Sequence, residues 1–280
     1  MESDRRRSIN APDQPSAEEA AAQLRNIDEV RDRSGRMHAP GALAVLGLWQ
    51  AFILPVYAWT LLTVMAPFDN SLYVVMPMII TSMLVGGAAE QFSVRQRIGS
   101  AMTVLLFALV LVFFALCILQ IIEQPYPRIL DTLLAIVLGL ALAVGPIRWW
   151  VAAEDRSVRW VRRPLSRSSR IVTVILGAIV GLLVVTAEWE HANVISLGVV
   201  VLFMVVAAMS LKDAGLRRTG YEWSLVHWLL FGIGTVVVCA VLLLSAFTDV
   251  LSPVLLATVG SAIGIAIAGS AFLPARGTQQ

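Results

Sequence analysis

Eight long apolar runs follow one another from Gly41 onward, and they constrain the fold of this sequence more than any other feature. They lie near 41–65, 72–90, 98–122, 130–151, 170–187, 193–211, 224–246 and 251–273. None carries a charged residue near its middle, and each is long enough to cross about 30 Å of hydrocarbon as a helix. Because backbone amides in lipid must be hydrogen-bonded internally, we predict that each run is helical.

The predicted fold class is all-α: a polytopic transmembrane helix bundle in which residues 41–273 form eight spans. Charged residues make up only 14% of the chain, whereas soluble domains carry roughly 25%. This composition excludes a water-soluble globular enzyme and a wholly disordered chain.

Two polar segments flank the predicted membrane domain. Residues 1–40 form a tail in which Ser16 and Glu19 have the spacing of a helix-capping box. Apolar side chains then recur at helical spacing, so we expect a short amphipathic helix over about 17–34. Residues 274–280 form a second, shorter tail.

The basic residues are distributed unevenly along the chain. If the runs cross the membrane in alternation, one side collects 20 of the 21 Lys and Arg residues and 13 of the 19 acidic ones, a formal charge of +7. The other side keeps Arg128 and six acidic residues, a formal charge of −5. Basic loops tend to stay in the cytoplasm. We therefore expect a multi-pass protein of the cell membrane (inner or plasma membrane) with both termini cytoplasmic.

The longest connection on the basic side, residues 148–170, holds seven arginines and three tryptophans. Each basic residue near an anionic bilayer surface contributes about 1 kcal/mol of attraction, so we expect this loop to contact anionic lipid headgroups. The alternative is a loop that a cytosolic or membrane protein partner grips. Nucleic acid is not expected as a partner, because no binding module is recognisable. The residues proposed for this contact are Arg156, Arg159, Arg162, Arg163 and Arg167.

Polar residues inside the predicted spans are few. Gln50 lies in the first run, five residues before Pro55, and Pro77 lies in the second run. A proline in a spanning helix frees a backbone carbonyl, so these three residues are the candidate lining of a polar path. A helix kink with structural hydrogen bonding is the simpler interpretation. His227, about one turn into the seventh run, is interpreted as a helix-interface residue.

One connection on the acidic side clusters residues that are capable of binding a metal. Glu188, Glu190 and His191 supply two carboxylates and an imidazole. They converge only if the turn folds back, and no second His or Cys is near in the sequence. We therefore interpret them as part of a solvated acidic rim, and we expect neither a metal nor another cofactor.

Small residues recur at four-residue spacing in three of the runs. Gly177 and Gly181 lie in the fifth run, Gly260 and Gly264 in the eighth, and Gly139 on a small-residue face of the fourth. Such faces let helix backbones approach closely in lipid. The spacing predicts helix packing, but it leaves open whether the helices pack within one chain or in a homo-oligomer.

The motif inventory leaves the function open. The sequence contains no Walker, dinucleotide-binding, H-E-x-x-H or G-x-S-x-G motif. The leading hypothesis is a non-catalytic permease-like or scaffold module that acts with partners. The alternatives are a transporter of a neutral or apolar solute and a membrane enzyme that uses the Glu/His group. The excess of arginine over lysine is typical of bacterial sequences.

Overall fold

The computed structural model describes residues 40–64, 71–91, 100–152, 162–187, 215–248 and 250–276, with short pieces between 198 and 205. These residues belong to one compact unit, Ala39–Gln280. The amphipathic helix predicted at 17–34 and most of the sixth predicted run lie outside the described residues.

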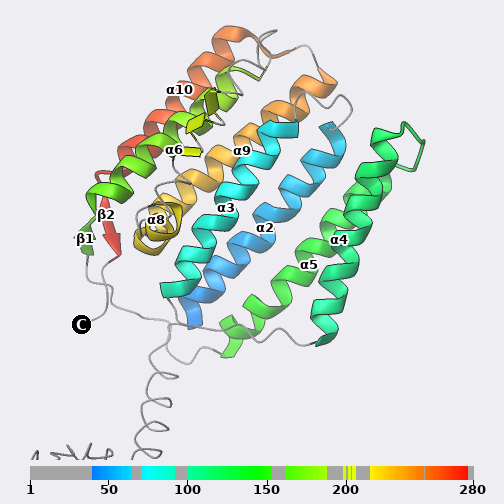
Figure 1. Ribbon diagram of the computed structural model, residues 1–280, viewed down its shortest axis with the longest axis horizontal. Helices are drawn as coiled ribbons and strands as arrows, with labels where there is room; N and C mark the ends of the chain where they lie inside the picture. The colour runs from blue at the N-terminus through cyan, green and yellow to red at the C-terminus, as the bar shows by residue number, and fades with distance from the viewer. Residues whose placement is uncertain are drawn as a thin grey trace, which may run out of the picture. The chain divides into compact units, whose positions relative to one another are not determined.

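Within the described residues, the chain forms eight bounded helices and one two-stranded ribbon (Figure 1). The helices are α2 (Pro40–Val64), α3 (Ser71–Gln91), α4 (Ser100–Ile121), α5 (Ile129–Ala152), α6 (Arg167–Val185), α8 (Leu216–Glu222), α9 (Leu225–Phe247) and α10 (Pro253–Ser270). The strands are β1 (Arg162–Pro164) and β2 (Pro274–Arg276), which pair antiparallel. The second polar tail therefore begins as a strand that is paired with the arginine-rich connection.

Six of these helices are long and apolar enough to cross a membrane: α2, α4, α5, α6, α9 and α10. Helix α3 holds a shorter apolar stretch, Tyr73–Ala89. The prediction of a nearly all-helical membrane bundle is therefore confirmed. The count of eight spans and the side on which each terminus lies stay predictions.

Serine caps explain where several helices begin. The Ser166 hydroxyl accepts a hydrogen bond from the Ser169 amide at 3.3 Å, so α6 begins at Arg167 rather than at the first apolar residue. Ser252 caps α10 in the same way, at 3.2 Å from the Leu255 amide. Because the first amides of a helix have no partner within it, these hydroxyls fix the start of each helix.

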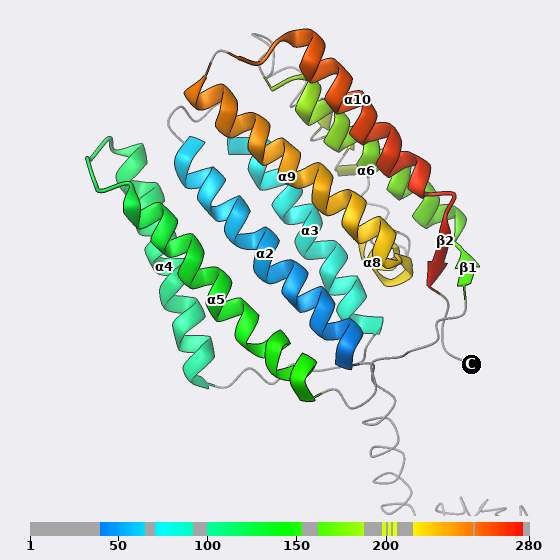
Figure 2. The ribbon, with the colours of Figure 1, turned by 180° about the vertical axis from the view of Figure 1, so that it is seen from behind.

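Helices pack most closely in three pairs: α6 with α10, α2 with α5, and α3 with α8. Figure 2 shows α10 beside α6 and shows α5 between α2 and α4. Helix α4 lies at the edge of the bundle. Only 11% of the residues in its apolar stretch are buried, compared with 56% in α2 and in α6. Most of its leucine, valine and phenylalanine side chains therefore face outward, as lipid-exposed residues do.

One end of the bundle gathers seven segment ends. The amide of Ser166 before α6 bonds Glu222 of α8, and His227 near the start of α9 bonds Ser270 at the end of α10. The last turns of α3 and α5 and the first turns of α2 join the same end through the packing of Gly87 on Arg217, Gly47 on Pro146 and Trp49 on Trp228. We call this the arginine-rich end.

The opposite end of the bundle has a different composition. Here Tyr73 at the start of α3 bonds Thr186 after α6, and Gln120 of α4 bonds the Leu62 carbonyl of α2. Of the nine Lys and Arg residues among those that the structure describes, only Arg128 lies here, between α4 and α5. The two ends of the bundle thus separate charge in the way that the sequence predicts.

Candidate functional site

The two glycine pairs that sequence spacing singled out on α6 and α10 lie against each other. A Cβ atom on Gly177 would lie 2.6 Å from the Gly264 carbonyl oxygen, and one on Gly181 would lie 2.9 Å from that of Gly260. Both distances are too short for a real Cβ. The backbones of α6 and α10 therefore touch directly, within one chain.

Gly139 serves a second close contact, between α5 and α2. A Cβ there would lie 3.2 Å from the Pro55 ring and 3.3 Å from the Ala51 carbonyl oxygen. Pro55 is half-buried and faces α5 in this way, while Pro77 is buried within α3. Gln50 is half-buried on α2, and no hydrogen bond joins it to another residue among those described.

A hydrogen-bonded cluster that sequence reasoning missed lies in the interior between α2, α3 and α9. The Tyr57 hydroxyl bonds Thr81 of α3 at 3.1 Å, and Thr235 of α9 donates to the Gly232 carbonyl at 2.9 Å. The Thr60 hydroxyl is fully buried, and among the described residues the Cys239 thiol of α9 is the polar group beside it. Tyrosine and threonine are uncharged and occur throughout apolar helices, so their positions in the sequence alone do not mark a polar cluster.

Glu222 is the acidic centre of the arginine-rich end. Its carboxylate accepts from the Ser166 amide at 2.9 Å and from the Arg218 Nε at 3.0 Å. Burial alone would raise the pKa of Glu222, but these donors outweigh it and lower the pKa below the usual range for glutamate. The carboxylate thus stays charged and ties α8 to the start of α6.

Trp223, between α8 and α9, and His227 of α9 form hydrogen bonds to two further helices. The Trp223 Nε1 donates to Thr173 of α6 at 3.0 Å, and its ring stacks on His227 with centroids 5.9 Å apart. The His227 Nδ1 accepts from the Ser224 amide, so Nε2 carries the proton and donates to the Ser270 carbonyl at 2.9 Å. His227 is therefore a helix-interface residue with both ring nitrogens in use.

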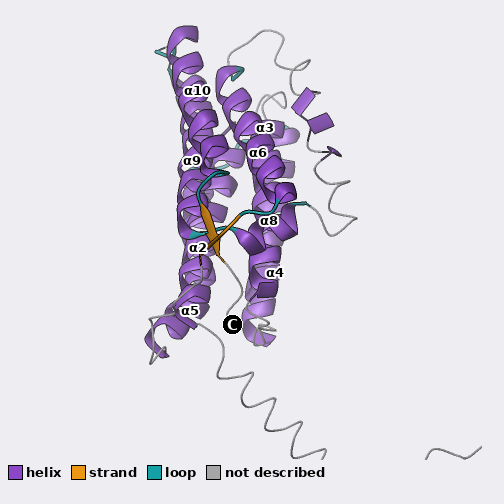
Figure 3. Cartoon of the chain, turned by 90° about the vertical axis from the view of Figure 1, so that its left-hand side faces the viewer, coloured by secondary structure: helices purple, strands orange, loops and turns teal. Residues whose placement is uncertain are grey.

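The arginines of this end come from segments that are far apart in the sequence. The antiparallel register places Arg162 of β1 opposite Arg276 of β2, and Arg163 and Arg167 are exposed beside them. Figure 3 shows the ribbon lying across the bundle next to α8. The other two predicted contact residues, Arg156 and Arg159, lie outside the described residues.

The opposite end holds a smaller polar cluster. The Tyr126 hydroxyl donates to Asp131 at 2.9 Å and accepts from the Gln120 amide at 2.7 Å. Burial and the neighbouring Asp131 carboxylate raise the pKa of Tyr126 to about 12. No group of three potential metal ligands occurs among the described residues, and the predicted Glu188, Glu190 and His191 lie outside them.

These features define a class: a helical membrane protein with a hydrogen-bonded interior and an arginine-rich end. Searches against known protein families, curated proteins and solved structures found no match for this chain.

Proposed function

We propose that the chain crosses the membrane eight times, with both termini in the cytoplasm. Helix α6 runs from the arginine-rich end to the opposite end, yet Gly215 before α8 lies back at the arginine-rich end, where α8 packs on α3. The chain between α6 and α8 must therefore lead back to the arginine-rich end. Val199, which belongs to this segment, is buried in the main apolar core. This supports the sixth predicted run, 193–211, as a crossing.

Within this topology, we propose a non-catalytic membrane module, a scaffold or permease-like subunit, that holds a partner protein at its cytoplasmic face. One observation carries the proposal: the hydrogen bond that Glu222 accepts and those that Trp223 and His227 donate connect α6, α8, α9 and α10 at one end. Arginines on a fixed support can form paired hydrogen bonds to carboxylates with little further loss of side-chain freedom. An acidic partner surface would therefore be recognised.

Affinity purification of the full chain in mild detergent tests this function. We expect a partner to co-purify with the unaltered protein and with Arg128→Glu, which changes a charge at the opposite end. The double substitution Arg162→Glu/Arg163→Glu should lose that partner. Equal recovery with both variants, or no partner and no self-association at native expression levels, would contradict the proposal.

A second function, transport of a neutral solute, is favoured by the interior hydroxyl cluster. Tyr57, Thr81 and the buried Thr60 lie on the two helices that carry Gln50, Pro55 and Pro77. In reconstituted vesicles, Gln50→Leu and Thr60→Val should each abolish uptake of a neutral solute. An unchanged rate in both variants would remove this path.

A further inference from the structure

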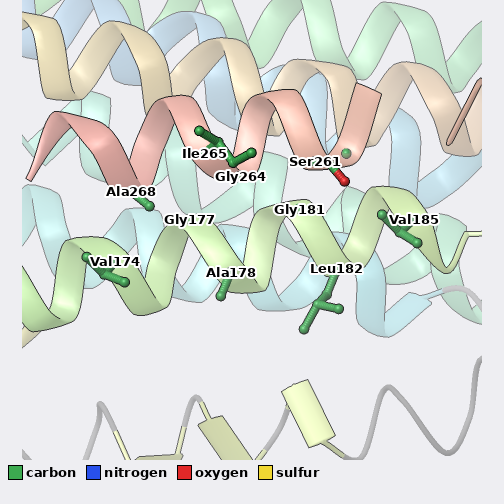
Figure 4. Close-up of a pocket in the computed structure, with 11 residues that line it drawn as sticks. Val174, Gly177, Ala178, Gly181, Leu182, Val185, Ser261, Gly264, Ile265 and Ala268 are labelled. Atoms are coloured by element: carbon green, nitrogen blue, oxygen red, sulfur yellow. The ribbon is translucent and has the colours of Figure 1, made fainter. Parts of the chain in front are cut away.

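An apolar groove of about 350 Å³ lies between α6 and α10 on the outer surface of the bundle (Figure 4). Val174, Ala178 and Leu182 of α6 form one wall, and Ile265 of α10, 71% exposed, stands on the other. The groove exists because the glycine backbones of the two helices touch at its floor and leave no side chain to fill it. Its lining would face lipid in the proposed membrane placement.

The length of the groove corresponds to about one leaflet. Its lining on α6 extends from Val174 to Val185, which is about 17 Å at a rise of 1.5 Å per residue. Half of the hydrocarbon core of a bilayer is about 15 Å. An acyl chain that is aligned with the helices would therefore be accommodated along its whole length.

Two arginines of α6 lie beyond the groove, toward the arginine-rich end of the bundle. Arg170 precedes Val174 by four residues and Arg167 precedes Arg170 by three, so all three lie on one face of α6. Arg167 is exposed, and the buried Nε of Arg170 has no hydrogen-bond partner in the part of the chain that the structure describes. On α10, Phe272 follows Ala268 of the groove by four residues and is 76% exposed, as aromatic rings at the headgroup level often are.

From this combination we infer that the α6–α10 groove binds one anionic phospholipid of the cytoplasmic leaflet. The phosphate bonds Arg167 and Arg170, and one acyl chain lies in the groove. A neutral lipid lacks the net charge that the two arginines complement, and an apolar partner helix would leave both arginines unmatched. The inference rests on the proposed membrane placement of α6 and α10, and it does not depend on the proposed protein partner.

The test uses the full chain in detergent, with native mass spectrometry to count bound lipids and thermal unfolding to measure stabilisation. The added probes are phosphatidylglycerol, phosphatidylcholine and inorganic phosphate. We expect one phosphatidylglycerol to be retained, and the melting temperature to rise with this lipid more than with the other two probes. In Arg167→Gln/Arg170→Gln the apparent affinity should fall about 30-fold, which corresponds to about 1 kcal/mol for each arginine.

A second variant tests the groove separately from the charges. Ala178→Phe fills the groove from an exposed position, whereas Ala115→Phe adds the same volume to the exposed face of α4. We expect only Ala178→Phe to lose the retained lipid, with both variants folded. Equal stabilisation by the two lipids, equal effects of phosphate and lipid, or retention in both arginine and groove variants would overturn the inference. A dimer that Ala178→Phe dissociates, with lipid binding unchanged, would identify a second copy as the occupant instead.

Discussion

Trp223 is a central packing residue of the arginine-rich end. It is 1% exposed, bonds Thr173, and packs its ring on His227, Trp228 and Phe231 at centroid distances of 5.3–5.9 Å. A buried indole donor without a partner would be costly, so Thr173 and Trp223 require each other. The aromatic cluster thus fixes where α6 lies relative to α9.

We therefore expect Trp223→Phe to destabilise the protein by about 1–3 kcal/mol, because Thr173 loses its donor and the smaller ring leaves a gap. Thermal unfolding in detergent measures the effect. Trp59→Phe, at a position that is 37% exposed, is the matched control and should change stability by less than about 0.5 kcal/mol. Similar losses in both variants would show that the hydrogen bond to Thr173 contributes nothing specific.

Glu222 makes the stability of the arginine-rich end depend on pH. Its pKa in the folded chain lies below the ordinary glutamate value of 4.5, so the unfolded chain takes up its proton first as the pH falls. The stabilisation by Glu222 is therefore complete at neutral pH and is lost as the pH falls below about 4.5 and through the folded pKa. Glu222→Gln should be less stable than the unaltered protein at pH 7, with the difference narrowing at pH 3.5.

Melting temperatures across that range check the prediction for Glu222. Glu123→Gln, which also removes one carboxylate but at an exposed residue of the opposite end, is the matched control. A difference between Glu222→Gln and the unaltered protein that stays constant with pH would show that the carboxylate charge has no part in the bond to Ser166.

Among the elements, α3 and α8 illustrate how backbone contact replaces side-chain packing. A Cβ on Gly87 of α3 would lie 1.8 Å from the Arg217 carbonyl oxygen, and one on Gly220 of α8 would lie 1.9 Å from that of Leu84. Neither distance is compatible with a side chain of any size. A Cβ on Gly86, the neighbour of Gly87, would have no other atom within 4 Å.

This adjacent pair gives a matched test of element packing. Gly87→Ala should destabilise the protein by at least about 1–3 kcal/mol, because α3 and α8 must separate. Gly86→Ala should be neutral or slightly stabilising, since alanine favours a helix over glycine. Thermal unfolding of the two variants decides the matter, and equal stability would mean that α8 does not pack on α3 in this way.

The sequence predicted the long helices but missed the short elements, for physical reasons. Apolar runs give the length of α2, α4, α9 and α10 to within a few residues, because hydrocarbon thickness sets that length. Helix α8 is too short and too charged to show in such a pattern. Strands β1 and β2 depend on pairing between distant segments, and no local property of three residues encodes their partner.

The candidate site, like the fold, could be predicted from the sequence only in part. Spacing identified Gly177, Gly181, Gly260 and Gly264, since small residues at four-residue intervals mark a helix face. It could not show that the two pairs meet, because helix order in a bundle leaves no local trace. Tyr57 and Thr81 were missed because their polarity matters only where the fold buries them together.

For the whole molecule, separation of charge between the two ends predicts topology. Labelling of intact cells with a membrane-impermeant thiol reagent tests this topology. Each variant carries one added cysteine, at position 128, 163, 191 or 276. Positions 163 and 276 should be protected together, because β1 and β2 are paired, while 128 and 191 should react. The native Cys117 and Cys239 are buried and give a low background. Labelling of 163 and 191 on the same side would contradict eight crossings.

The pairing of β1 with β2 also has a consequence for the order in which the protein assembles. During synthesis, the first strand emerges before α6, and its partner emerges only after α10 has left the ribosome. Until then, the backbone groups of the first strand lack this partner and stay open to other contacts, as exposed strand edges do. The ribbon can therefore form only after the last described helix has been synthesised, and a chain that is released before the second strand would carry an unpaired strand edge.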